Sequence, residues 1–506
     1  MKRLFELLAA PVCVVMLCAG AARAQQQGQD QSQQPAPTQG QQQTTPDQGA
    51  TQPQGPIPAY RSPLAGAADN EDEETPTEIA PDTNSLSGVR NLGLGTLTER
   101  SYWQPHFDIF STIDSNPQEN AGGATNWTTF DSFSGGVDLH HQSGKSNLTV
   151  SYLGGGTVSN AGGTENGIVQ GLDFTENLTF RRWIVSFIDQ LYYLPQSAAG
   201  FNGLGNVALP GSGGGGLGTG FTPGQTLLTG QGQSLDNSFY TEADALLTPR
   251  SSLTFVGGYT LLHYFDSDLL NYGTEIFRAG YNYQLDRKDT VALNYTFSEY
   301  NYSHESQSIT SHAAQVSYGR RVTGRLAFQV AVGPEVVLFH TPISVGTGSS
   351  GTGGTGSPLG GPTTQIYWTA NANVQYALGR TGFGMAYFHG VGGGSGVLAG
   401  ALTDTVTGSI TREMSRTFTS AVIGGYSRNQ GTAITTTTPL NQTYDYWYGG
   451  ANLTYPIART LALTVAYQLQ YQTSNGAFCI GPTCGTSVVR HMISFGFGWH
   501  ERPLHF

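Results

Sequence analysis

The stretch Thr290–Ser298, TVALNYTFS, alternates strictly between two kinds of side chain. Its large apolar residues occupy every odd position from Val291 to Phe297, and the small or polar residues lie between them. In an extended chain these two sets point to opposite faces. The same pattern returns at 365–378, QIYWTANANVQYAL, and at 461–472, LALTVAYQLQYQ. The pattern predicts β-strands with one apolar face and one polar face.

The length of these runs separates two kinds of all-β protein. Strands of a soluble sandwich average about 5 or 6 residues, whereas strands that cross a membrane at a tilt need about 9 to 11. The runs above reach the longer value, which favours strands that span a bilayer.

The composition agrees with this interpretation. Only 11% of the 506 residues are charged and 69 are Gly, whereas soluble globular domains have about 25% charged residues and about 7% Gly. The formal net charge of −12 has the wrong sign for a nucleic-acid-binding protein. After the N-terminus no apolar run approaches the roughly 18 residues of a membrane-spanning helix.

The first hundred residues form two segments of different character. Lys2 and Arg3 precede an apolar run that ends in Ala22-Arg23-Ala24, so we expect residues 1–24 to be a cleaved signal peptide. Residues 25–101 are rich in Gln, Pro and Thr, with an acidic run near their centre, and are expected to be a disordered tail. The alternating runs then define a separate domain, expected over 102–506.

Two cysteines remain after the predicted cleavage, Cys479 and Cys484, in a turn-rich segment. Exported proteins usually pair such thiols. We predict a small loop disulfide, in preference to free thiols or a metal site.

Short cationic turns separate the alternating runs at one end of the predicted hairpins. They lie at 180–182, 249–251, 286–289, 321–325, 379–381, 415–417 and 458–460. The opposite connections are long and rich in Gly, Asn, Ser and Thr, notably 195–235 and 341–362. Short turns on one side and long loops on the other are typical of transmembrane barrels.

Counting the runs between these markers gives eighteen strands, an even number with both termini on the short-turn side. The predicted ranges are 102–113, 128–140, 147–158, 170–180, 183–194, 236–248, 252–265, 274–285, 290–302, 309–321, 325–339, 364–378, 381–391, 397–413, 417–428, 442–456, 461–473 and 487–499. The pattern is weakest at 102–113 and 397–413, so sixteen strands remain an alternative. The fold class is an all-β, antiparallel up-and-down transmembrane barrel.

With its signal peptide, alternating strands, short turns and terminal Phe506, the sequence resembles Gram-negative outer-membrane β-barrel proteins of the porin-like kind. The resemblance covers about 102–506. It implies an outer-membrane location, contact with outer-membrane lipid, and recognition of Phe506 by the barrel assembly machinery. Glu501-Arg502-Pro503 departs from the pattern, because Pro cannot donate to a strand ladder.

Aromatic residues toward the strand ends are expected at the two bilayer interfaces. The set comprises Tyr281, Tyr283, Tyr300, Tyr302, Tyr444, Tyr446, Trp447 and Tyr448.

No catalytic, cofactor or metal site is predicted. The G-x-S-x-G nucleophile motif is absent. His140 and His141 are adjacent in a predicted strand, so they point to opposite faces and do not form a metal-binding pair.

The predicted function is passive diffusion of small hydrophilic solutes through the barrel. The polar face carries few charges, and the candidates for the lumen are Asp173, Arg278, Glu335, Asp445 and Arg490. They suggest a weakly cation-preferring or non-selective channel. The loop 195–235 is the candidate for a segment folded into the pore. A structural, adhesin-like or polysaccharide-export barrel is the alternative, and the apolar outer face leaves a homotrimer possible.

Overall fold

The computed structural model describes the residues 101–117, 127–159, 166–194, 233–265, 269–303, 308–323, 325–340, 363–394, 396–415, 418–432, 442–480 and 483–506. All of them belong to one compact unit, Gly55–Phe506. The predicted signal peptide, almost all of the predicted tail, and residues 195–232 of the candidate pore loop lie outside the described residues.

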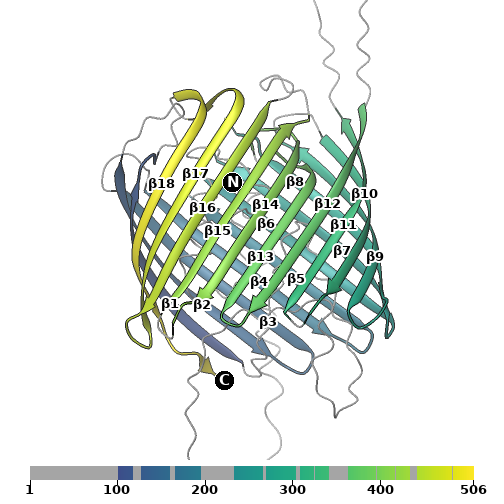
Figure 1. The fold of residues 1–506 in the computed structure, drawn as a ribbon, viewed down its shortest axis with the longest axis horizontal. Coiled ribbons are helices and arrows are strands. Elements are labelled where there is room, and N and C mark those ends of the chain that lie inside the picture. Colours follow the sequence, from purple (N-terminus) through teal and green to yellow (C-terminus); the bar gives the residue numbers. More distant parts are fainter. Residues whose placement is uncertain are drawn as a thin grey trace, which may run out of the picture. The chain divides into compact units, whose positions relative to one another are not determined.

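In the described residues, eighteen long strands and the short strand β19 (Leu504–His505) form a single antiparallel sheet (Figure 1). Their bounds are β1 (Tyr102–Asp114), β2 (Thr128–Gln142), β3 (Ser146–Ser159), β4 (Gly167–Thr179), β5 (Trp183–Leu194), β6 (Ser234–Thr248), β7 (Ser251–Tyr264), β8 (Tyr272–Gln284), β9 (Asp289–Tyr302), β10 (Ser308–Arg321), β11 (Leu326–His340), β12 (Thr363–Leu378), β13 (Thr381–Gly392), β14 (Ala401–Glu413), β15 (Thr419–Gly431), β16 (Thr443–Pro456), β17 (Leu461–Ile480) and β18 (Thr483–His500). Each long strand pairs with its neighbours in sequence, and β1 also pairs with β18, so the sheet closes into a barrel. The prediction of eighteen strands is confirmed.

The C-terminus continues the barrel wall after a break. Residues 501–503 interrupt β18, and the short strand β19 (Leu504–His505) then pairs with the first two residues of β1. The backbone N–H of Phe506 donates to the carbonyl oxygen of Ser101 at 3.2 Å. Phe506 is thus attached to the ladder despite Pro503.

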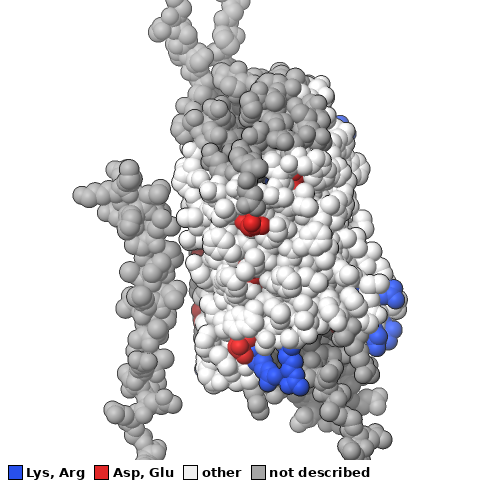
Figure 2. Space-filling model, turned by 90° about the vertical axis from the view of Figure 1, so that its left-hand side faces the viewer, with Lys and Arg blue, Asp and Glu red and all other residues white. Residues whose placement is uncertain are grey.

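The two faces of the sheet differ as the sequence pattern predicts. Leu293, Val316 and Phe497 are among the exposed apolar side chains of the outer face, whereas Asn294 and Ser317 are buried on the inner face. Figure 2 shows an outer wall that is largely free of charge, with Lys and Arg gathered at its lower end. This is the polarity of a barrel surrounded by lipid. No helix in the described part of the chain is long and apolar enough to span a bilayer.

The short turns form because side chains satisfy their backbone groups. In the turn between β8 and β9, Oδ1 of Asp286 accepts hydrogen bonds from the N–H groups of Lys288 and Asp289, at 2.6 and 2.8 Å. These hydrogen bonds hold the pKa of the Asp286 carboxyl below its usual value.

The strands β17 and β18 are longer than predicted: β17 continues to Ile480, and β18 begins at Thr483. Their backbones place Cys479 directly opposite Cys484 in the antiparallel register. Opposed positions of this kind suit the Cα separations of disulfides, and the disulfide itself stays a prediction.

Contact of the outer face with lipid can be tested by placing an arginine either within a strand or in the turn at its end. Leu293, four residues into β9, is 60% exposed, and Leu285, in the β8–β9 turn, is 50% exposed. We expect Leu293→Arg to lower the free energy of unfolding from lipid by about 2–4 kcal/mol, and Leu285→Arg by at most about 1 kcal/mol. Equilibrium unfolding in urea from lipid vesicles measures both, and equal costs would show that Leu293 does not face the hydrocarbon core.

Candidate functional site

The connection between β13 and β14 is folded into the barrel. We call residues 393–400 the inner loop; its described part excludes residue 395. Its sequence is rich in glycine, and Gly394, Gly396 and Gly400 have φ angles of +82°, +79° and +83°. A Cβ atom at Gly394 would lie 1.9 Å from the carbonyl oxygen of Leu398, so only glycine permits this fold of the loop.

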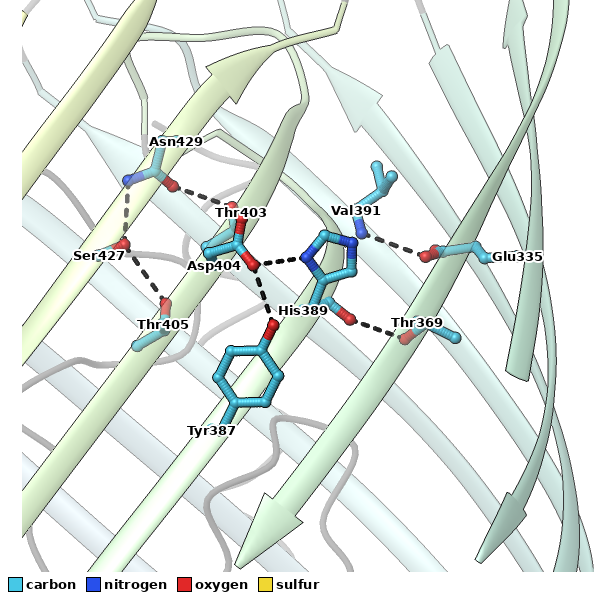
Figure 3. A network of polar contacts seen from close by, with 10 residues as sticks. All are labelled: Glu335, Thr369, Tyr387, His389, Val391, Thr403, Asp404, Thr405, Ser427 and Asn429. Atoms are coloured by element: carbon cyan, nitrogen blue, oxygen red, sulfur yellow. Dashed lines mark hydrogen bonds and ion pairs between the residues drawn. The ribbon is translucent and has the colours of Figure 1, made fainter. Parts of the chain in front are cut away.

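The loop turns inward because β13 separates from β12. Pairing between these two strands ends at Ala370 with His389, although β12 continues alongside β11 as far as Thr363. Figure 3 shows the contacts at the point of separation. The hydroxyl of Thr369 donates to the carbonyl oxygen of His389 at 3.0 Å, and this hydrogen bond holds β13 against the inner side of β12.

Glu335, which lies on β11, anchors β13 where that strand leaves β12. Its Oε2 accepts the N–H of Val391 at 3.3 Å (Figure 3). Its Oε1 accepts the hydroxyl of Ser311 at 2.6 Å. The carboxylate is buried, so these two hydrogen bonds replace part of the hydration it loses. Glu335 therefore faces inward as predicted, and its observed contacts position the base of the inner loop.

On the outer face, an aromatic ring covers the place where β13 separates from β12. His389 Nδ1 lies 2.6 Å from Asp404 Oδ1, which also accepts the hydroxyl of Tyr387 at 3.1 Å (Figure 3). The Trp368 ring stacks on the His389 ring with centroids 3.8 Å apart. These contacts close the wall where the backbone ladder ends.

Two apolar clusters hold the loop in the interior. One joins Ala399 and Val391 to side chains from β7 to β11, and these partners are Leu262, Tyr264, Tyr272, Tyr302, Ile309, Val337 and Phe339. The other packs Leu398 and Val397 against Ile423, Tyr444, Tyr446, Tyr448 and Val488. The inner loop thus contacts two separate sectors of the barrel wall.

Tyrosine hydroxyls bind the loop backbone within the first cluster. Tyr300 donates to the carbonyl oxygen of Val391 at 3.2 Å, and Tyr302 donates to that of Gly393 at 3.1 Å. The N–H of Leu270 donates to the carbonyl oxygen of Gly396 at 2.8 Å. A loop whose carbonyls are satisfied in this way has a defined position rather than many alternatives.

Five aromatic residues predicted at the bilayer interfaces face inward instead. Tyr281, Tyr283 and Trp447 are exposed on the outer wall as expected. Tyr300, Tyr302, Tyr444, Tyr446 and Tyr448 lie on the inner face. The expectation was wrong for these five tyrosines because they pack against the inner loop or donate hydrogen bonds to its backbone and base.

The inner wall is strongly acidic on one side. Among the described residues, the buried inward-facing carboxylates are Asp108, Asp114, Asp138, Asp236, Glu242, Asp244 and Glu335, and six of these seven lie on β1, β2 and β6. The buried inward-facing guanidinium groups are those of Arg278 and Arg490. The buried carboxylates thus gather on β1, β2 and β6, whereas the two buried guanidinium groups lie on β8 and β18.

The structure places four of the five predicted lumen charges on the inner face. Arg278, Glu335 and Arg490 are buried there, and Asp173, which is only partly buried, accepts the hydroxyl of Tyr192 at 2.6 Å. Asp445 is different, because it shares its face with the exposed Trp447 and accepts the hydroxyl of Tyr426 at 2.6 Å. It belongs to the outer wall, and its assignment to the lumen was wrong.

Arg490 forms a buried ion pair where the barrel closes. Its Nε and Nη2 both donate to Oδ2 of Asp114, at 2.9 and 2.6 Å. Both side chains are at most 1% exposed. Ser115 and Asn116 continue this contact by hydrogen bonds to the backbones of His491 and Val489. The pair fastens β1 to β18 beyond the end of their ladder.

The interior is lined by polar and charged side chains from many strands. Within the described ranges, no three His, Cys, Asp or Glu side chains are arranged to hold a metal ion. Many inward polar groups are almost fully buried, as Asp244 and Gln470 illustrate.

Comparison with known proteins finds distant matches among solved structures only. No family model and no curated protein matches the sequence. Similar solved structures include OccAB3 of Acinetobacter baumannii, with 9% identity and a TM-score of 0.38 over 79% of this chain and 99% of that one. The outer membrane protein opdK of Pseudomonas aeruginosa has 10% identity and a TM-score of 0.37. OccK2 (OpdF) of the same organism, in complex with glucuronate, has 10% identity and a TM-score of 0.39. Each match covers 80% of this chain and 99% of the other chain. Values of this size assign neither an activity nor a solute to the present chain.

Proposed function

We propose that this protein is an outer-membrane channel for the passive diffusion of small hydrophilic solutes, with a preference for cations. The observation that carries the proposal is the closed barrel with an apolar outer wall and an acidic inner wall. A lipid-facing barrel needs the apolar wall alone, whereas buried inward charges are costly unless they serve contacts or solutes inside.

The same proposal includes the placement of the chain. The short-turn end with its Lys and Arg groups faces the periplasm, together with the N-terminal tail, and the long connections face outward. Recognition of Phe506 by the barrel assembly machinery and assembly into a homotrimer are parts of this proposal that rest on the resemblance and on the apolar outer wall.

The acidic side of the interior gives the proposal a direct test. Asp236, Glu242 and Asp244 face inward from one strand, β6. We expect the triple variant D236N/E242Q/D244N to move the reversal potential in a salt gradient toward zero, because fewer negative charges then attract cations. The measurement uses the full barrel in a planar bilayer.

A matched control removes the same number of carboxylates from the outer wall. Asp189, Glu275 and Asp445 alternate in phase with exposed apolar residues of their strands. The triple variant D189N/E275Q/D445N is expected to leave the reversal potential unchanged. An anion preference of the natural protein, or equal shifts in both variants, would overturn the assignment of selectivity to the inner wall.

A further inference from the structure

A cluster of metal-binding side chain types lies inside the barrel at its short-turn end, where β1, β2 and β18 meet. His106 and Asp108 come from β1, Asp138 from β2 and His500 from β18. The register places His106 opposite both His500 and Gly136. Three strands thus bring two imidazoles and two carboxylates together on the inner face.

The donors stand in two pairs. Nδ1 of His106 is 3.4 Å from Oδ2 of Asp138, and Nε2 of His500 is 3.9 Å from Oδ1 of Asp108. The two imidazole rings stack with their centroids 5.7 Å apart. Ligands of a tetrahedral zinc ion, with bonds of about 2.0–2.1 Å, lie about 3.3–3.4 Å from one another. The first pair already has this spacing, and the second is somewhat wider.

Several of these atoms are buried without a hydrogen-bond partner. Both carboxylate oxygens of Asp108 lack one, although the side chain is 0% exposed, and so do Nδ1 of His106 and Nε2 of His500. Oδ1 of Asp108 faces the imidazole of His500 at 3.9 Å, which is longer than a hydrogen bond. A cation held between these donors would offset the cost of burying the carboxylate.

Two glycines make room for the cluster. A Cβ atom at Gly498 would lie 2.5 Å from Oδ1 of Asp108, and one at Gly136 would lie 2.4 Å from Nε2 of His106. At Gly136 the Cβ atom would lie closer still, 2.2 Å, to the carbonyl oxygen of Tyr152, so a larger residue there would meet the backbone as well. Gly498 thus leaves room for Asp108 and His500, and Gly136 leaves room for His106 and for the neighbouring strand.

We propose that His106, Asp108, Asp138 and His500 bind one divalent transition-metal cation at the short-turn end of the barrel interior. Imidazole and carboxylate donors suit Zn²⁺ and its neighbours in the first transition row. As placed, no three of the donors surround one point, so binding draws the two pairs together by rotation of the side chains. This site does not depend on which solute the channel conducts.

The test is a calorimetric titration of Zn²⁺ into the full-length, chelator-treated protein in detergent. The expected result is saturable uptake of one Zn²⁺ per chain, lost in the variant H106Q/H500Q. The variant D108N, which keeps the size of the side chain and removes its charge, should bind more weakly. Heat-modified mobility on gels, measured without metal, verifies that each variant is folded.

The matched control removes two histidines from the outer wall. His312 contacts the hydroxyl of Tyr295, and His491 contacts that of Tyr467, each within 3.0 Å. H312Q/H491Q should bind Zn²⁺ as the natural protein does. Absence of stoichiometric uptake by the natural protein, or equal loss in both double variants, would overturn the proposal and leave two ordinary His–Asp pairs.

Discussion

Replacing the inner loop, residues 393–400, by the dipeptide Asn-Gly is expected to raise the single-channel conductance several-fold. Gly392 and Ala401 are register partners, so a two-residue hairpin turn can join the strands directly. The replacement removes Leu398 and Ala399 from their two apolar clusters and empties the space between them. Conductance in a planar bilayer measures the result.

A second variant keeps the length of the loop. Leu398 is 1% exposed in its cluster, and Leu398→Asp would place a carboxylate among Tyr444, Tyr446 and Tyr448. Because a buried unpaired charge is very costly, the loop should leave the interior and the conductance should rise here too. Replacing Gly379-Arg380, the two-residue turn at the opposite end of β13, by Asn-Gly is the control and should change little. Unchanged conductance in both loop variants would mean that the solute path bypasses the inner loop.

Removing either member of the Asp114–Arg490 pair is expected to be the most damaging single substitution for stability. Both side chains are almost fully buried and joined by two short hydrogen bonds. Asp114→Leu or Arg490→Met leaves one charge buried without the other member of the pair, which costs about 3–5 kcal/mol. Equilibrium unfolding from lipid vesicles measures this loss.

The double variant D114L/R490M measures the coupling between the two charges apart from the cost of burying each of them. Replacing both charges by apolar side chains removes the desolvation cost together with the attraction, so we expect it to be much less destabilising than either single change. If the two single losses simply add in the double variant, the ion pair does not fasten β1 to β18.

The fold could be predicted from the sequence because each strand carries its own signal. Alternation at 290–298 and 461–472 fixed both the strand and its outward face, and the Arg-containing turns fixed the hairpin ends. The range predicted as 397–413 begins at Ala401 instead, because Val397 and Leu398 are apolar through contacts of the inner loop and not through strand pairing.

The interior was harder to predict, since it depends on contacts between distant strands. In Tyr444-Asp445-Tyr446-Trp447-Tyr448 both faces carry aromatic residues, and only the packing of Leu398 shows that the tyrosines point inward. Asp108, Asp138, Asp236, Glu242 and Asp244 were missed as inward charges, although each alternates with apolar residues on the other face. Their positions between outward apolar residues could have identified them as inward-facing.

The inner loop had a weaker signal in the sequence. Gly392–Gly400 is shorter than the loop 195–235, and length favoured the longer segment as the part folded inward. Val397, Leu398 and Ala399 lie among its glycines, but the longer segment also carries apolar residues such as Phe201 and Leu204, so composition did not separate the two loops.

Single-channel recording of the refolded full-length protein in a planar bilayer tests most directly whether a solute path runs through this barrel. We predict discrete conductance steps that are small for an eighteen-stranded barrel, because the inner loop narrows the interior. A protein that inserts into the bilayer and passes no current would contradict it.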